Sequence, residues 1–172
     1  MGREGRNEGA DGMIINGKTL LEYAPIKGML NHKVRGGVTS HGLSEAGYDI
    51  TIKQDIVFHE FGVAHEVDGI RKMGNFTLAS SVEEFDMPKN VVGIVHDKST
   101  WARMGLSVFN TVIEPGWKGF LTLELVYHGN GSLLIPSGCG IAQVLFHFTT
   151  NDAEYNGKYQ NQADKPVEAI NG

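Results

Sequence analysis

Apolar and polar residues alternate along most of the chain after Gly47, and glycine, proline, asparagine or aspartate separates the alternating segments. This pattern predicts short strands that bury one face each. Strands are expected over residues 48–52, 76–79, 91–95, 106–112, 119–126, 133–135 and 141–148. Short strands at such spacing predict a sandwich, a jelly roll or a distorted barrel.

Helical patterns are scarce. Residues 19–22, Thr-Leu-Leu-Glu, have the form of a capping box, and Pro25 closes that segment after about two turns, so one short helix is predicted near the start. Two tight turns are marked by Glu114-Pro115-Gly116 and by Gly129-Asn130-Gly131. The residues 59–75 are rich in Gly and His and favour an insertion or a loop. The expected fold is mainly β with one or two short helices.

Length and charge narrow the classes of protein. A chain of 172 residues, 41% of them hydrophobic, is long enough for one core and short for two domains. The formal net charge of −5 argues against a nucleic-acid partner, because such binders usually present a basic face. Any anionic ligand must therefore meet a local cluster of cations.

Cysteine usage and hydropathy predict a protein of a reducing compartment. Cys139 is the only cysteine of the sequence, and no apolar stretch has the roughly 18 residues that a membrane span needs. We therefore expect no membrane partner and a cytoplasmic location. Residues 1–12 carry acidic residues and glycines but no apolar centre, which predicts a flexible tail and not a signal peptide.

The chemistry is concentrated between Lys98 and Glu124. A polar and basic turn, K-S-T-W-A-R-M-G-L, is followed by E-P-G-W-K-G and then by a strand that contains L-E. This order suits a polyphosphate site beside a single general base. Glu124 stands between Leu123 and Leu125, so a cleft there can raise its pKa enough for proton transfer. The alternative is an ordinary strand carboxylate that faces solvent.

These segments resemble the dCTP deaminases of the trimeric dUTPase-like superfamily, whose pattern is R-S-S-L-A-R-L-G-L, I-D-P-G-W-x-G and L-E at the same spacing. Four more segments are similar in family order, from about residue 43 to residue 163: A-G-Y-D-I at 46–50, F-T-L-A-S-S-V-E at 76–83, P-S-G to I-A-Q at 136–143, and Y, G-K-Y and Q at 155–162.

The resemblance implies a distorted jelly-roll or β-barrel domain of the dUTPase-like type over residues 13–150. It also implies that residues 151–172 form a lid over the nucleotide, since a segment that orders on a triphosphate is polar in sequence. A plain disordered terminus is the alternative for the lid. The implied assembly is a homotrimer with the active sites between subunits.

The implied activity is hydrolytic deamination of dCTP to dUTP and ammonia, which supplies dUTP and dUMP for thymidylate synthesis. Most nucleobase deaminases activate water with zinc held by a P-C-x-x-C motif and a further His or Cys. This sequence has one cysteine, and its seven histidines show no i, i+4 pair. The expected reaction is therefore zinc-independent, with water polarised by protein groups.

By the same resemblance, Glu124 is the catalytic glutamate, and Ser99 and Arg103 assist near the phosphates and the reacting base. A structural salt bridge is the alternative for Arg103. The triphosphate clamp is expected to combine Lys98, Ser99 and Thr100 with Lys158 and Gln162 of the lid. Lys98 replaces a family arginine and loses its two-pronged donor geometry. Mg²⁺ is expected to accompany the triphosphate with few direct protein ligands.

The sugar and the base have their own predicted contacts. Glu114, at a family aspartate, is expected to meet the 3′-hydroxyl, and Trp117 to stand where a 2′-hydroxyl would lie, although Trp117 also suits plain packing. Thr122 and Tyr155 complete the expected substrate contacts. Phe109-Asn110 replaces a family Thr-Ala, which places Asn110 near the pyrimidine. The changes at Asn110 and Glu114 either shift the substrate, for example toward a modified cytosine nucleotide, or weaken activity.

Three other functions stay open at this point. A plain dUTPase shares the fold but lacks the counterpart of Glu124. A bifunctional enzyme would convert dCTP directly to dUMP and pyrophosphate. A non-catalytic regulator of the same fold would bind nucleotide without turnover, and the changes at Asn110 and Glu114 are its support.

Overall fold

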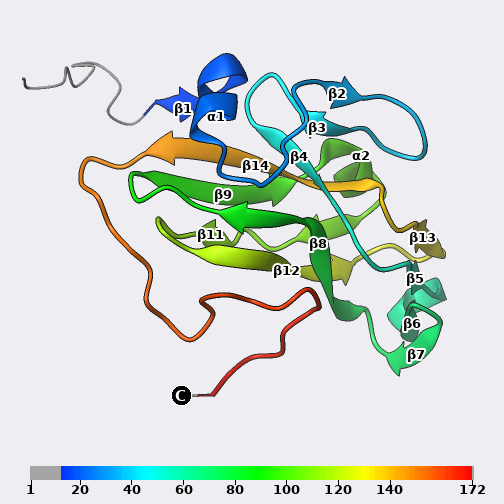
Figure 1. Cartoon of the computed structure of the whole chain (residues 1–172). Coiled ribbons are helices and arrows are strands. Elements are labelled where there is room, and N and C mark those ends of the chain that lie inside the picture. Colours follow the sequence, from blue (N-terminus) through cyan, green and yellow to red (C-terminus); the bar gives the residue numbers. More distant parts are fainter. Residues whose placement is uncertain (1–12, 172) are drawn as a thin grey trace, which may run out of the picture.

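The protein folds as a stack of antiparallel sheets with two short helices at its periphery (Figure 1). The computed structural model describes residues 13–171, and the predicted flexible tail, residues 1–12, lies outside the described residues. The mainly β prediction is confirmed. No helix among the described residues is long and apolar enough to cross a membrane.

The largest sheet has seven strands in the order β11-β9-β14-β4-β3-β2, and β1 pairs with the end of β14. Its central strands are β9 and β14, which run antiparallel from Ala142↔Asp97 to Phe148↔Val91. The bounds of the seven strands are β1 Ile14–Ile15, β2 Lys33–Val34, β3 His41–Leu43, β4 Tyr48–Thr51, β9 Val91–Asp97, β11 Val112–Ile113 and β14 Gly140–Phe148.

The second sheet has the order β10-β12-β8, with β8 at Phe76–Asp86, β10 at Leu106–Val108 and β12 at Lys118–Tyr127. A register shift between Phe120 and Thr122 bends β12 against β8. The single strand predicted over residues 106–112 is wrong, because β10 and β11 belong to different sheets. Residues 109–111 form the link between them and bring Thr111 beside β12.

The third sheet has the order β13-β5-β6-β7, with β5 at Ile56–Phe58, β6 at Ala64–Val67, β7 at Ile70–Met73 and β13 at Leu133–Ile135. Residues 59–75, for which an insertion or a loop was expected, form the 3₁₀ turn η1 Glu60–Gly62 and the β6–β7 hairpin, so the loop alternative is wrong. All four residues of β7 are exposed, so the strand has no buried face and leaves no alternating pattern.

Two helices are present among residues 13–171: α1 at Gly17–Tyr23 and α2 at Ser99–Arg103. The predicted capping box of α1 is wrong. Asn16 is the N-cap, its side chain makes no capping hydrogen bond, and Thr19 lies inside the helix. The helix ends at Tyr23, and its C-cap Ala24 adopts a left-handed conformation (φ 45°) directly before Pro25.

One hydrophobic core joins the first two sheets. β9 and β14 contribute Val95, Val144 and Phe146, and β12 contributes Leu123 and Leu125. Every one of these side chains is almost fully buried. The core fixes the orientation of the strands, and therefore it decides which side chains of β12 face away from it.

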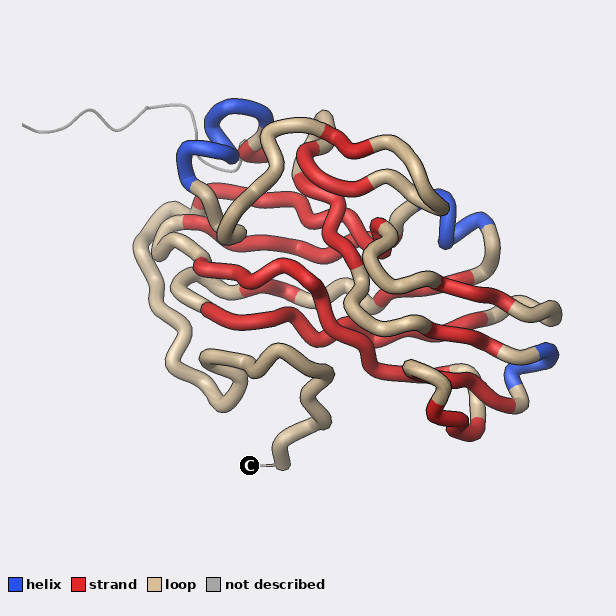
Figure 2. Tube along the Cα trace, turned by 45° about the vertical axis from the view of Figure 1, so that its right-hand side comes forward, coloured by secondary structure: helices blue, strands red, loops and turns tan. Residues whose placement is uncertain are grey.

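After β14 the chain forms no further helix or strand up to residue 171. Figure 2 shows it as one long loop that runs back across the molecule. The loop is held by backbone hydrogen bonds, among them Asn161 N to Lys118 O at 2.9 Å and Phe120 N to Gln162 O at 3.2 Å. This C-terminal segment therefore lies along β12 and does not leave the domain surface.

Candidate functional site

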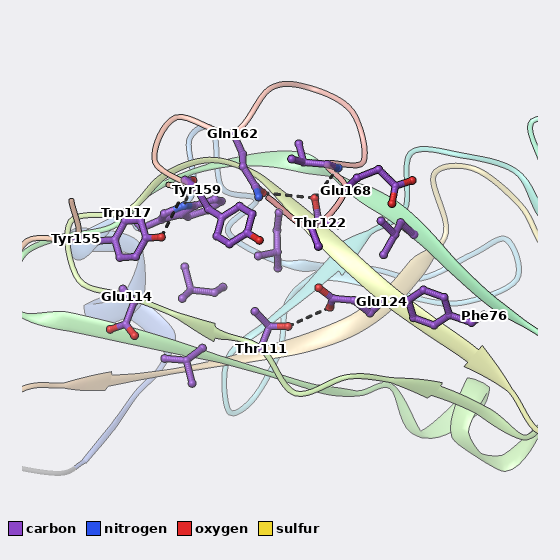
Figure 3. A pocket seen from close by; sticks show the side chains of 16 residues that line it. Phe76, Thr111, Glu114, Trp117, Thr122, Glu124, Tyr155, Tyr159, Gln162 and Glu168 are labelled. Carbon is purple, nitrogen blue, oxygen red and sulfur yellow. Dashed lines mark hydrogen bonds between the residues drawn. The ribbon is translucent and has the colours of Figure 1, made fainter. Parts of the chain in front are cut away.

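A cavity of about 390 Å³ opens between β12, the β10–β11 link and the C-terminal segment (Figure 3). Its walls come from three parts of the chain that are far apart in sequence, residues 76–78, 111–124 and 155–169. The lining residues are Phe76, Leu78, Thr111, Val112, Ile113, Glu114, Trp117, Leu121, Thr122, Glu124, Tyr155, Tyr159, Gln162, Val167, Glu168 and Ala169. We refer to this cavity as the β12 pocket.

Glu124 lies in the floor of the β12 pocket because of the alternation of β12. Its neighbours Leu123 and Leu125 are 1% and 0% exposed and point into the core, so the carboxylate between them points the opposite way. Partial burial raises the pKa of Glu124. The Thr111 hydroxyl donates to the carboxylate, Oγ1 to Oε2 at 3.1 Å, which lowers the pKa by less than burial raises it.

The C-terminal segment closes one side of the β12 pocket. Val167 N donates to the Thr122 hydroxyl at 3.0 Å, and that hydroxyl donates in turn to Gln162 Oε1 at 3.4 Å. Gln162 forms a parallel bridge with Gly119 of β12. A Cβ on Gly119 would stand 2.5 Å from Gln162 N, so only glycine allows this approach.

Aromatic side chains form another wall. Trp117 Nε1 donates to Tyr159 O at 2.6 Å, and Tyr159 N donates to the Tyr155 hydroxyl at 3.3 Å. Trp117 is held at the end of the predicted Glu114-Pro115-Gly116 turn, which closes with Trp117 N to Glu114 O at 3.1 Å. Glu114 thereby reaches the rim of the pocket, where its side chain is exposed.

The charge of the β12 pocket is negative. Its described lining includes the carboxylates of Glu114, Glu124 and Glu168 and contains no Lys, Arg or His. Within residues 13–171 no three His, Cys, Asp or Glu side chains come together as a metal site would require. Within residues 13–171, a single chain therefore offers an aromatic and apolar cavity with a partly buried carboxyl group, but no cation in its lining that could face a polyphosphate.

The basic turn that the sequence singled out lies elsewhere. Ser99, Thr100 and Arg103 are exposed on α2 and do not line the β12 pocket. In the described part of the chain none of the three has a side-chain hydrogen bond or ion pair, so the structural salt bridge considered for Arg103 is not formed there. Lys98, just before α2, instead pairs with Asp49, Nζ to Oδ2 at 2.7 Å.

Two further predicted contacts also lie outside the lining. Asn110 is exposed at the β10–β11 link, while Thr111 next to it enters the pocket. Lys158 donates to the backbone carbonyl of Ile170 and lies over the ring of Tyr159, 5.5 Å from its centroid. Six of the predicted residues are brought together in the lining: Glu114, Trp117, Thr122, Glu124, Tyr155 and Gln162.

Sequence reasoning missed several lining residues. Thr111 is the most important, because its hydroxyl contacts Glu124. Its signal was a threonine directly after the Phe109-Asn110 pair, which stands where the family has Thr-Ala. Tyr159 was part of the quoted G-K-Y segment but was not selected. Phe76 and Leu78 stand in the segment 76–83 that was matched to the family, but they were not selected as site residues. Residues 167–169 carry no local signal, because only the tertiary fold brings them to the pocket.

Comparisons with known proteins agree with this architecture. A family model described as "dCTP deaminase-like" matches residues 45–149. A dCTP deaminase of Roseiflexus castenholzii is 38% identical, with 82% of this chain and 88% of the relative covered. A dCTP deaminase of Herpetosiphon aurantiacus is 35% identical with the same coverage, 82% and 88%.

A solved structure shows the same fold. The dUTPase of Staphylococcus bacteriophage 80alpha superposes with a TM-score of 0.50 and 15% identity, over 77% of this chain and 91% of that chain. The dUTPase-like fold expected from the sequence is thereby confirmed. The family model and the sequence relatives go further than the fold, and the chain belongs to the dCTP deaminase-like family.

Proposed function

We propose that the protein catalyses the hydrolytic deamination of dCTP to dUTP and ammonia without zinc. The single observation that carries this proposal is Glu124: a carboxyl group on the floor of an apolar and aromatic cavity, with a raised pKa and a hydroxyl donor at 3.1 Å. Its family membership supports the choice of substrate, because the relatives named above are dCTP deaminases.

The proposed reaction uses Glu124 as a proton shuttle. Its carboxylate takes a proton from a water molecule as the water oxygen bonds to C4 of cytosine, and it passes that proton to ring N3. The remaining hydroxyl proton then moves through the same carboxylate to the amine. The bond between C4 and the exocyclic amine nitrogen breaks, ammonia leaves, and the C4 carbonyl of dUTP forms. A pKa above that of an ordinary glutamate suits both transfers.

The β12 pocket suggests how the nucleoside lies. The cytosine would sit at the Glu124 end, beside Thr111 and Thr122, and the sugar against Trp117 and Tyr155, with Glu114 at its 3′-hydroxyl. Residues 151–172 would act as the lid, with Gln162 above the base and Lys158 near the phosphates. Lys158 would have to leave the Ile170 carbonyl for that contact.

We further propose a homotrimer in which α2 of one subunit completes the β12 pocket of a neighbour. In the part of the chain that the structure describes, the lining of the β12 pocket has no cation for a triphosphate, whereas Arg103, Ser99 and Thr100 are exposed and their side chains make no hydrogen bond or ion pair. Mg²⁺ would accompany the triphosphate and keep several of its waters, so that the nucleotide and not the protein would supply most of its other ligands.

Product analysis with dCTP and Mg²⁺ tests the reaction. The protein is expected to release ammonia and dUTP in equal amounts. Release of dUMP and pyrophosphate from dCTP would show a bifunctional enzyme, and hydrolysis of dUTP with unreacted dCTP would show a plain dUTPase. Binding of dCTP with no product would show a nucleotide-binding regulator. Each of these three outcomes replaces the proposed function.

A further inference from the structure

Lys98 and Asp49 form a deeply buried ion pair beneath α2. The two side chains are 11% and 3% exposed, and Lys98 Nζ donates to Asp49 Oδ2 at 2.7 Å and to Ser40 Oγ at 3.4 Å. Asp49 lies in the middle of the seven-stranded sheet, opposite Gln143 of β14 and Gly42 of β3. The pair therefore joins the residue before α2 to the centre of the fold.

A second contact ties α2 to the same place. Trp101, 1% exposed, donates from Nε1 to the carbonyl of Gly140 at 2.7 Å, and Thr39 Oγ1 donates to the same oxygen at 2.6 Å. A Cβ on Gly140 would stand 2.0 Å from Ser40 O and 3.3 Å from Lys98 Cε. Glycine at this position allows the Ser40 backbone to approach β14 closely beside the lysine stem.

These contacts leave the other polar side chains of α2 exposed on the surface. Ser99, Thr100 and Arg103 are exposed, while Lys98 and Trp101 hold the segment from below. Lys98 Nζ and Asp49 Oδ2 are 2.7 Å apart, so a phosphate that approached the Lys98 ammonium would also approach the Asp49 carboxylate. Repulsion by that carboxylate opposes the approach, because charges in a poorly solvated site are only weakly screened.

We propose that Lys98 holds α2 in place and does not bind the triphosphate, and that Asp49 is a positioning residue that acts through Lys98. We call Lys98, Asp49, Trp101 and Gly140 the α2 anchor. The anchor sets where Ser99, Thr100 and Arg103 stand when they meet the nucleotide. The choice of dCTP as the ligand rests on the proposed function, whereas the ion pair itself does not depend on it. The inference replaces the role in the phosphate clamp that the sequence predicted for Lys98.

The test compares Asp49→Asn, Lys98→Met and the double variant. Each single change leaves the other charge buried without its partner, which is strongly destabilising. We expect each to lower the melting temperature and to weaken dCTP binding at least tenfold. The double variant leaves no unpaired charge, and methionine keeps most of the lysine volume. We expect it to regain most of the melting temperature and to bind dCTP within about threefold of the wild type.

A phosphate-binding Lys98 predicts a different pattern. The double variant would then bind dCTP as poorly as Lys98→Met, and its ratio of dCTP to dCMP affinity, measured by calorimetry, would fall below that of the wild type. Under the anchor proposal this ratio in the double variant stays at the wild-type value. Unchanged dCTP binding in Asp49→Asn also overturns the proposal, as does a double variant that fails to fold.

A matched control is the exposed ion pair of Lys27 and Glu84, with Nζ to Oε1 at 2.6 Å and side chains that are 55% and 38% exposed. Lys27→Met, Glu84→Gln and their combination are expected to change the melting temperature little, because exposed pairs contribute little. If the wild type neither binds nor converts dCTP, the proposed function fails, and recovery of the melting temperature in the double variant still tests the anchor.

Discussion

At the scale of the residue, Glu124 experiences two opposing influences. Burial among apolar neighbours favours its protonated form, and the Thr111 hydroxyl favours its ionised form. The balance leaves the pKa raised, as proton transfer at neutral pH requires. Strand alternation was enough to predict that Glu124 points away from the core, but not that it faces a cavity and not solvent. It was not enough to predict Thr111, because that residue reaches the carboxylate only through the break between β10 and β11.

Replacing Thr111 by valine tests this balance. Thr111→Val keeps the shape of the side chain but removes the donor to Glu124, so the pKa of Glu124 rises further. The ionised base is needed for the attack of water, and therefore the acid limb of the kcat/KM profile for dCTP should move to higher pH. An acid limb that stays in place or moves to lower pH would show that Thr111 does not govern the ionisation of this group.

At the scale of the element, the long strands β9, β12 and β14, each with a buried face, were predicted. The short strand β5 was missed although Ile56 and Phe58 are buried, and β7 was missed because all of its residues are exposed. The path of the C-terminal segment also could not be predicted from local sequence patterns. Its polar residues bond mainly to the backbone of β12 and of the turn before it, as Asn161 N does to Lys118 O and Gln160 Nε2 to Gly116 O. Such contacts depend on the fold and leave no periodicity in the sequence.

Gly119→Ala tests how β12 holds this segment. The new Cβ would collide with Gln162 N, and Gly119 has a φ of +131°, which alanine adopts only with strain. The free energy of unfolding is expected to fall by about 1–3 kcal/mol. Residues near Gln162 should become sensitive to limited proteolysis, and KM for dCTP should rise.

The control for this change is Gly131→Ala. Gly131 lies in the turn after β12 and has open space around its Cα and no positive φ. Its substitution is expected to leave proteolysis and KM as in the wild type. Equal proteolysis of Gly119→Ala and the wild type would mean that the contact of Gln162 with Gly119 does not hold the segment.

At the scale of the whole molecule, the two halves of the predicted chemistry stand apart in one chain. Glu124, the proposed proton shuttle, lies in a pocket whose described lining has no cation, and the exposed basic turn lies outside it. The sequence predicted both halves, but composition and spacing do not reveal which subunit supplies each. In the proposed trimer, the basic turn of one subunit would lie at the β12 pocket of its neighbour. Closed cyclic assemblies repeat the same contact at every interface, so each of the three pockets would be completed in the same way.

Subunit mixing tests this arrangement. Glu124→Gln and Arg103→Ala chains should each form inactive trimers, with a mass three times that of the chain by light scattering. When the two are refolded together in equal amounts, about one quarter of the sites should combine an intact Glu124 with an intact Arg103, and activity should reappear. No gain over the separate variants would mean that each chain builds its own site.

The most direct measurement for the central claim is single-turnover conversion of dCTP by Glu124→Gln, together with its affinity for dCTP. Glutamine keeps the shape of the side chain but cannot carry the proton, so the rate should fall by about 10²–10⁴ while dCTP binding stays close to that of the wild type. Glu84→Gln, on β8 and outside the β12 pocket, should react as the wild type does. Conversion by Glu124→Gln at the wild-type rate would contradict the role given to Glu124.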